Sequence, residues 1–225
     1  MDIDKRGDVA VVSLGDGPNA VDAPFLADLN KALDEVEADP TVTALVTTAS
    51  GKHYSNGFDL DFLGGLGDDA MSFLDDTART LARILTFGVP TAAALNGHAF
   101  GAGAMLALAH DVRAQNAERG WFCFPEVDLH MHFMPFQLSL ITRKLPGPAI
   151  DEAILTGRRY DGTDALAAGI VGASVPPGAV VDAAITLTAP YTGKARDAVS
   201  ALKRQLRAET LALLPRAGRA SARVP

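Results

Sequence analysis

Short apolar strands alternate with amphipathic helices along this sequence, and that alternation restricts the fold more than any other feature. Apolar, partly β-branched runs at 8–14, 42–49 and 91–95 are typical of buried strands. Between them, apolar residues recur every three or four positions over 22–39 and 69–87, which predicts helices that each bury one face. Strands that alternate with helices predict an α/β fold with a mostly parallel sheet.

The remainder of the chain continues this alternation. Residues 2–6 are predicted to form a hairpin with the first strand, and the glycine- and aspartate-rich stretch 60–68 is predicted to be mobile. Further strands are expected at 111–116, 121–124 and 170–175, and further helices at about 101–110, 136–144, 150–156, 163–169, 178–189 and 193–214. No linker in the sequence divides it convincingly into separate domains.

Charge and composition exclude several classes of protein. A net charge of −7 argues against nucleic acid as the main partner, because phosphate backbones need a basic face. No stretch of about 18 uninterrupted apolar residues is present, so no membrane span is expected. The single cysteine, Cys123, rules out an internal disulfide and fits a reducing compartment. A cytoplasmic protein is therefore expected.

Two glycine-containing loops each follow an apolar strand, and we call them the donor loops. The first, residues 52–59, reads KHYSNGFD, and the second, residues 96–104, reads NGHAFGAGA. Gly57 permits a sharp turn, and the second loop runs directly into a helix whose first N–H groups lack helical acceptors. Both loops can therefore direct free backbone N–H groups at one negatively charged group.

One carboxylate, Glu126, follows the donor loops in the segment WFCFPEVD at 121–128. Its aromatic and aliphatic neighbours predict burial, which raises the pKa of a carboxyl group towards neutrality. Such a group can remove and return a proton, while backbone donors stabilise the resulting enolate oxygen. Taken alone, Glu126 could instead be an exposed charge at the end of a strand.

The two donor loops and the Pro125–Val127 segment, in this order and spacing, resemble the crotonase superfamily, also called the enoyl-CoA hydratase/isomerase family. The resemblance covers about residues 8–175. It implies a crotonase-like spiral of ββα units with C-terminal helices. The implied division is a spiral core at 1–175 and a helical region at 176–225 that serves oligomerisation and covers the active site. A homotrimer or a dimer of trimers is expected by the same resemblance.

The resemblance also implies a reaction. It places the thioester oxygen of an acyl-CoA on the backbone N–H groups of Asn56 and Ala102, with Glu126 as the catalytic acid and base. A second glutamate of the family's hydratases falls on Met105, which cannot activate water. A single glutamate is similar to the pattern of the Δ3,Δ2-enoyl-CoA isomerases, which implies conversion of 3-enoyl-CoA to trans-2-enoyl-CoA in fatty acid β-oxidation. No cofactor and no metal are required.

Residues that contact the substrate or its CoA part are also implied. They are Lys52, Tyr54, Phe58, Asp59, Leu60, Met105, His130 and His132. Lys52 is the best candidate for a CoA phosphate, although a solvated position explains it equally well. Asp59 also fits a turn or cap.

His130 and His132 lie where the family usually has glycine and a Pro-Gly pair. If this segment is a strand, both rings share one face. They can then line the pocket, act as a further acid or base, or simply pack. A zinc site is disfavoured because no clear third ligand is visible.

Two alternatives stay open from the sequence, and a third is disfavoured. Another enolate reaction of the family, such as hydration, hydrolysis or C–C cleavage, would use the same donors. A non-catalytic acyl-CoA-binding protein would keep the donors without depending on Glu126. A dinucleotide-binding loop at Gly101–Gly103 is disfavoured, because Leu106 occupies the position of its third glycine.

Overall fold

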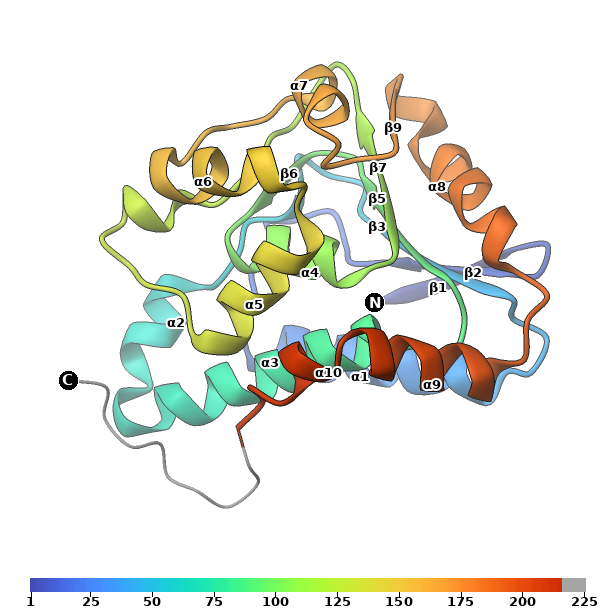
Figure 1. The fold of residues 1–225 in the computed structure, drawn as a ribbon, viewed down its shortest axis with the longest axis horizontal. Coiled ribbons are helices and arrows are strands. Elements are labelled where there is room, and N and C mark those ends of the chain that lie inside the picture. The colour runs from blue at the N-terminus through green and yellow to red at the C-terminus, as the bar shows by residue number, and fades with distance from the viewer. Residues whose placement is uncertain (216–225) are drawn as a thin grey trace.

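The computed structural model describes residues 1–215, and two sheets organise this part of the chain (Figure 1). The larger sheet has the strand order β1-β2-β3-β5-β7-β9, in which only the β1–β2 pair is antiparallel. Its strands are β1 (Asp2–Arg6), β2 (Val9–Ser13), β3 (Ala44–Thr48), β5 (Thr91–Leu95), β7 (Val112–Asn116) and β9 (Ala173–Val175). The smaller, parallel sheet consists of β4 (His53–Ser55), β6 (His98–Phe100) and β8 (Phe122–Cys123).

The two sheets share one repeating unit of two strands and a helix. Strand β3 is followed by β4 and then α3 (Ala70–Leu85), β5 by β6 and α4 (Ala102–Ala109), and β7 by β8 and α5 (Pro135–Lys144). In each unit the first strand joins the larger sheet and the second joins the smaller one. The expected α/β spiral of ββα units is therefore confirmed.

The helices begin and end where their sequences predict. Helix α1 (Ala23–Ala38) starts after Asp22, whose side chain accepts a hydrogen bond from the Phe25 N–H. Its buried face carries Leu29 and Leu33, which are fully buried. Helix α3 buries Phe73, Leu81 and Ile84 in the same way, because apolar residues three and four positions apart share one face.

Helices cover both faces of the larger sheet. Helices α1, α3 and α4 share one apolar core with it, while Val180 and Ala184 of α8 (Val180–Thr188) pack against the opposite face. Every residue of α4 is buried, and its sequence AGAMLALA consists mostly of small side chains that allow close packing. Helix α4 therefore crosses the centre of the molecule, and its two ends are fixed in place.

Four details differ from the expectations. Residues 53–55 and 98–100, expected within loops, form strands of the smaller sheet, and 60–68 contains α2 (Leu60–Gly65) and a 3-10 turn. The last helix is divided at Arg207 into α9 (Arg196–Leu206) and α10 (Ala208–Leu211).

Helices α6 (Gly147–Thr156) and α7 (Gly162–Ala167) lie close to their expected positions. Within residues 1–215, no helix is long and apolar enough to cross a membrane.

Candidate active site

The three strands of the smaller sheet bring the two donor loops and Glu126 to one edge. Strand β6 pairs with β4 on one side and with β8 on the other, and all three run parallel. The carboxyl ends of parallel strands meet at the same edge of a sheet. The end of β4 leads to Asn56, the end of β6 leads to Gly101, and the end of β8 leads to Glu126. The short strands thus position segments that are far apart in the sequence.

The N-terminus of α4 lies against the Glu126 carboxylate. Gly101 precedes the helix with φ +48°, a conformation that favours glycine. A Cβ atom on Gly101 would lie 3.2 Å from Glu126 Oε1, so the carboxylate sits directly over this glycine. Ala102 begins the helix, and its N–H has no acceptor within the helix. The Glu126 carboxylate and the free N–H group of Ala102 therefore both lie at the start of α4.

The first donor loop packs directly on the second. A Cβ on Gly57 would lie 2.7 Å from the Phe100 carbonyl oxygen and 3.4 Å from the Ala102 nitrogen. A Cβ on Gly103 would lie 2.4 Å from the Ser55 carbonyl oxygen, which is closer than any side chain permits. Close backbone contact explains why both positions carry glycine, and at Gly57 the φ of +85° favours glycine as well.

The hydrogen bonds of the first donor loop correct one prediction. The Asn56 N–H donates to the Pro18 carbonyl at 2.9 Å, so it is not free to bind an oxyanion. The Gly57 N–H donates to Ser55 Oγ at 3.3 Å, and the Asp59 N–H donates to the Val21 carbonyl at 3.2 Å. Among residues 1–215, nothing accepts the Phe58 N–H. The free donor of this loop is therefore Phe58 rather than Asn56.

Glu126 is buried and incompletely paired. Its residue is 8% exposed, and its Oε2 atom is buried without a hydrogen-bond partner among the described residues. Burial raises the pKa of its carboxyl to about 7, as its apolar neighbours predict. A 3-10 turn over Pro125–Val127 and a hydrogen bond from the Met131 N–H to the Glu126 carbonyl hold the backbone. Such a carboxyl can exchange a proton near neutral pH.

The other predicted contact residues lie in different surroundings. Tyr54 is fully buried, and its hydroxyl bonds to Thr47 Oγ1 at 2.7 Å, so the prediction that it contacts substrate is wrong. Asp59 caps α2 by accepting the Phe62 N–H at 2.9 Å, which is the alternative expected for it. Met105 is 1% exposed within the core. Lys52 and Leu60 are exposed, and Phe58 packs edge-on against Phe73.

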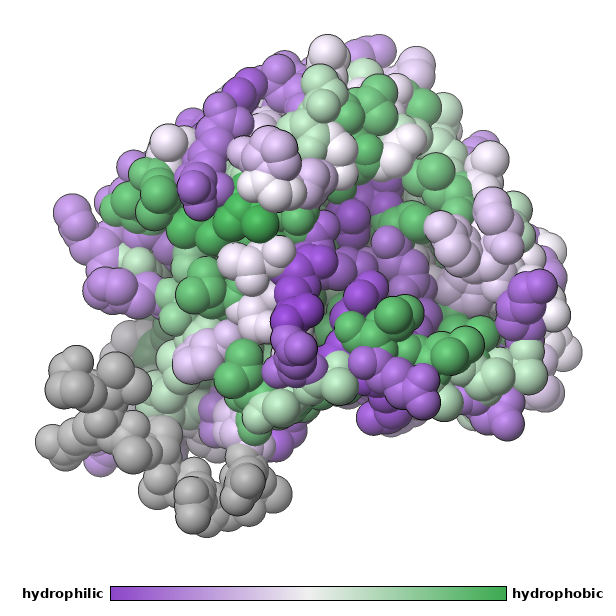
Figure 2. Space-filling view, viewed as in Figure 1, coloured by the Kyte–Doolittle hydropathy of each residue, from purple (hydrophilic) through white to green (hydrophobic). Residues whose placement is uncertain are grey.

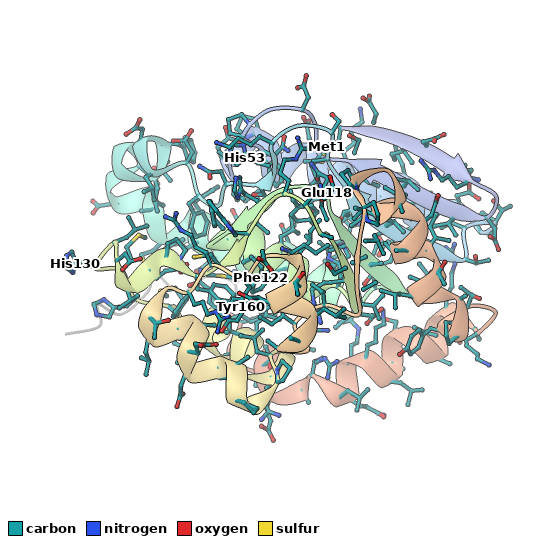
Figure 3. All side chains as sticks on the ribbon, turned by 90° about the horizontal axis from the view of Figure 1, so that it is seen from above. Met1, His53, Glu118, Phe122, His130 and Tyr160 are labelled. Carbon is teal, nitrogen blue, oxygen red and sulfur yellow. The ribbon has the colours of Figure 1, made fainter. Side chains whose placement is uncertain are left out.

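His130 and His132 do not share the face of a strand. Both lie between the Pro125–Val127 turn and α5, outside any strand, and both side chains are exposed. His130 adopts φ +54°, and Figure 3 shows it at the periphery, far from the labelled Phe122 and Tyr160. In the described part of the chain, no three His, Cys, Asp or Glu side chains gather closely enough to hold a metal ion.

A buried chain of hydrogen bonds beneath the site was not foreseen from the sequence. His110 Nε2 bonds to Thr47 Oγ1 at 3.0 Å, which in turn bonds to the Tyr54 hydroxyl. The other His110 nitrogen, Nδ1, bonds to the Leu106 carbonyl at 2.9 Å. Burial lowers the pKa of His110 to about 3, so its ring is neutral. The chain ties the first donor loop to the far end of α4, and only the fold brings these residues together.

Comparisons with known proteins agree on one family. The family model described as "Enoyl-CoA hydratase/isomerase" matches residues 4–224. An enoyl-CoA delta isomerase of Arabidopsis thaliana is 32% identical over 82% of this chain and 82% of its own length. A putative enoyl-CoA hydratase of Thermus thermophilus is 34% identical over 95% of this chain and 84% of its own length.

Solved structures show the same fold. The crystal structure of a probable enoyl-CoA hydratase from Mycobacterium tuberculosis superposes with a TM-score of 0.86 at 30% identity, covering 95% of this chain and 90% of that one. Isomerase and hydratase names both occur among these similar proteins. The likeness therefore identifies the family and the fold, but it does not distinguish between the two reactions.

Proposed function

The chain belongs to the enoyl-CoA hydratase/isomerase family, and we propose that it is an isomerase that converts 3-enoyl-CoA to trans-2-enoyl-CoA. The observation that carries this proposal is a single buried carboxyl, Glu126, beside the free N–H groups of Phe58 and Ala102. Met105, at the position of the second hydratase glutamate, offers a buried thioether that cannot activate water.

The proposed mechanism uses one group for both proton transfers. Glu126, as carboxylate, removes a proton from C2 of the bound thioester, and the electron pair moves onto the carbonyl oxygen. The N–H groups of Phe58 and Ala102 hold this dienolate oxygen, and the positive end of α4 adds to its stabilisation. The protonated Glu126 then returns the proton at C4, so the double bond moves from C3–C4 to C2–C3 without net gain or loss of atoms.

The environment of Glu126 suits this chemistry. A carboxylate in water is a weak base, whereas burial raises the pKa of Glu126 to about 7 and makes its ionised form more basic. We therefore expect kcat/KM for 3-enoyl-CoA to rise with pH and to level off above an apparent pKa of about 7. Lys52, exposed beside the first donor loop, is the proposed contact for a CoA phosphate.

The test compares two substrates on the same protein. Purified protein is incubated with trans-3-hexenoyl-CoA, and the conjugated 2-enoyl thioester is followed by its absorbance. In parallel, trans-2-hexenoyl-CoA is supplied, and loss of the conjugated absorbance reports hydration. Glu126→Gln serves as the matched variant, because it keeps the shape of the side chain and removes its ability to accept the proton.

An isomerase produces the conjugated product from the 3-enoyl substrate, and we expect Glu126→Gln to lower kcat by about 10²–10⁴-fold. Binding of the substrate, measured by calorimetry, stays within a few-fold of wild type. Faster hydration than isomerisation would establish the hydratase alternative and contradict the proposal. Binding of both thioesters without conversion of either would leave an acyl-CoA-binding protein.

A further inference from the structure

A cluster of positive charge lies at the C-terminal end of α4, opposite the end that faces Glu126. We call it the basic cluster. It comprises Arg113 on β7, Lys144 at the end of α5, and Lys203 and Arg207 at the end of α9. Lys203 pairs with Asp111, which directly follows the His110 cap of α4, and the charges of Arg113, Lys203 and Arg207 all act on Lys144. Figure 2 shows this face hollowed between α5 and α9, with hydrophilic side chains inside the hollow.

The cations of the basic cluster have few partners within the described residues. Lys203 Nζ contacts Asp111 Oδ2 at 2.5 Å and the Val89 carbonyl at 3.0 Å. Lys144 Nζ donates to the His110 carbonyl at 2.7 Å, and Arg113 Nη1 donates to the same oxygen at 3.2 Å. Within residues 1–215, the contact of Lys203 with Asp111 is thus the one ion pair of these four cations, and the other contacts of Lys203, Lys144 and Arg113 are to neutral carbonyls.

Arg207 shows most directly that the basic cluster has more positive than negative charge. Its Nε atom is buried and has no hydrogen-bond partner among residues 1–215, although a buried guanidinium nitrogen ordinarily has one. Arg113 is itself only 8% exposed, so its charge is removed from bulk water. Burial, together with the charge of Arg113, lowers the pKa of Lys144 to about 7. Excess buried charge of one sign is costly unless a counter-charge is bound.

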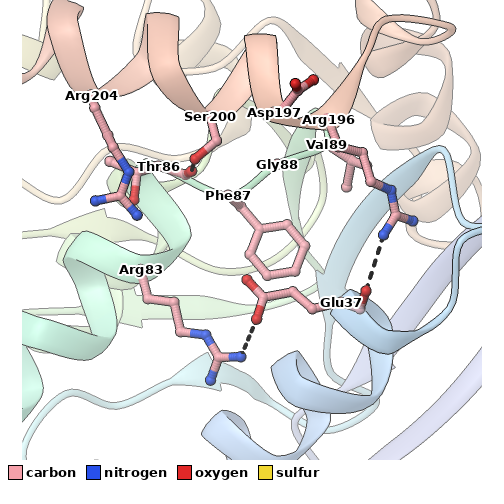
Figure 4. Close-up of a pocket in the computed structure, with 10 residues that line it drawn as sticks. All are labelled: Glu37, Arg83, Thr86, Phe87, Gly88, Val89, Arg196, Asp197, Ser200 and Arg204. Carbon is pink, nitrogen blue, oxygen red and sulfur yellow. Dashed lines mark hydrogen bonds and ion pairs between the residues drawn. The ribbon is translucent and has the colours of Figure 1, made fainter.

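A second cavity provides a contrast, because two carboxylates, Glu37 and Asp197, line it together with its arginines. This cavity, of about 250 Å³, lies between the ends of α1 and α3 and helix α9 (Figure 4). There Arg83 pairs with Glu37 and Asp34, and Arg196 donates to the carbonyls of Glu37, Asp39 and Val42. The charge of Arg83 in that cavity is therefore compensated by carboxylates of the protein itself. The basic cluster lacks such compensation.

We propose that the basic cluster binds a phosphate-type oxyanion, either inorganic phosphate or the terminal phosphate of a phosphate monoester. Arginine presents a planar fork of N–H donors that matches such an anion, and lysine adds a point charge. An anion in the hollow would give the Arg207 Nε atom its missing acceptor. The carbonyl of His110 accepts a hydrogen bond from Lys144, and its ring belongs to the buried chain of hydrogen bonds that leads to Tyr54. An anion bound to Lys144 would therefore also stabilise the C-terminal end of α4.

The experiment measures binding of inorganic phosphate at pH 7 by calorimetry, with ionic strength held constant by sodium chloride. Glycerol 3-phosphate forms a second arm that separates free phosphate from a phosphate monoester. The variant is Arg207→Gln, and its matched control is Arg204→Gln, which removes the same charge from the same helix but lines the cavity of Figure 4. Should Arg207→Gln fail to fold, Lys144→Gln replaces it, with the exposed Arg143→Gln as control.

We expect one bound anion per chain in wild type and in Arg204→Gln, with affinity at least about tenfold weaker in Arg207→Gln. Tighter binding of glycerol 3-phosphate than of inorganic phosphate identifies a monoester as the ligand, and the reverse identifies free phosphate. Absence of binding in wild type, or equal weakening in both variants, overturns the proposal. A further result would also overturn the proposal: wild type binds no phosphate, and Arg207→Gln changes the oligomeric state. The counter-charge for Arg207 would then come from a second copy of the chain.

Discussion

The two ends of α4 differ in the sign of the charge that is buried there and in the groups that lie around it. At the N-terminal end, one carboxyl, Glu126, lies against Gly101 at the start of the helix, and its Oε2 atom has no partner in the described structure. At the C-terminal end, four cationic side chains gather near one carboxylate, Asp111, which pairs with Lys203, and the Arg207 Nε atom has no partner within residues 1–215. In both places the protein keeps a polar atom unsatisfied inside the fold, which is unusual unless a ligand completes it.

The difference between the ends lies in what holds the geometry. Backbone donors at the first end are fixed by close contacts of Gly57 and Gly103, so they cannot rearrange when charge develops on a substrate. Long side chains from three elements build the second end, and these can adjust to an anion. The first arrangement suits a short-lived oxyanion in a reaction. The second suits an anion that binds and dissociates at equilibrium.

The largest expected effect distinguishes the donors of the first loop. Replacing Phe58 by its α-hydroxy analogue puts an ester oxygen in place of the N–H, and we expect kcat to fall about 10²–10³-fold. The same replacement at Asn56 removes only the bond to Pro18 and should cost about 1 kcal/mol of stability with little change in kcat. The measurement is the isomerase assay on both semisynthetic proteins. A larger loss of kcat at Asn56 would restore the prediction made from the sequence.

A somewhat smaller effect is expected at the other end of α4. Asp111→Asn removes the carboxylate that pairs with Lys203 and leaves that lysine without its counter-charge. We expect the free energy of unfolding to fall by about 3 kcal/mol, at the low end for buried pairs because both side chains keep some exposure. Urea denaturation at pH 7 measures this. An unchanged midpoint would show that the cluster is not electrostatically strained.

The buried Glu126 should lower stability at high pH. Its pKa rises from 4.5 to about 7 on folding, so between these values the unfolded chain releases its proton while the folded chain keeps it. Stability contributed by the neutral carboxyl is therefore present below about pH 4.5 and is lost as pH rises through 7. We expect Glu126→Gln to be more stable than wild type by about 3 kcal/mol at pH 8. Thermal unfolding of both proteins at pH 8 and pH 4 checks this, and the difference should shrink at pH 4.

The smallest effects are expected at His130 and His132. Both side chains are exposed, so His130→Ala and His132→Ala should each change stability by less than about 0.5 kcal/mol. The rate of isomerisation should stay within about threefold of wild type. A tenfold loss in either variant would instead indicate that the segment closes over the substrate and supplies an acid or base.

Sequence patterns predicted the parts of the fold that depend on near neighbours. The strands at 8–14, 42–49 and 91–95 and the helices at 22–39 and 69–87 all lie within a few residues of their expected bounds. Strands β4 and β6 were missed because three residues are too short to show alternation, whereas β8 lies within the strand expected at 121–124. Their pairing across the chain, rather than local preference, makes them strands.

Some residues of the candidate site were predicted correctly and others were not, because some depend on near neighbours in the sequence and others on distant ones. Glu126 and Ala102 stand out locally, one by its apolar neighbours and one by its glycine-flanked helix start. The choice between Asn56 and Phe58 was wrong because it depends on Pro18, whose carbonyl takes up the Asn56 N–H from another part of the chain. Tyr54 was misplaced because its partner Thr47 belongs to the larger sheet.

The sequence by itself determined the alternation of strands and helices, the glycines that permit close backbone contact, and the presence of one carboxyl among apolar side chains. These follow from side-chain size, backbone freedom and hydrophobic period, which act over a few residues. Tertiary structure alone decided which N–H groups stay free and which charges share one space. Residues from 111 to 207 meet in the basic cluster only after the sheet and helices have packed, because electrostatic and hydrogen-bond partners are chosen by distance in space.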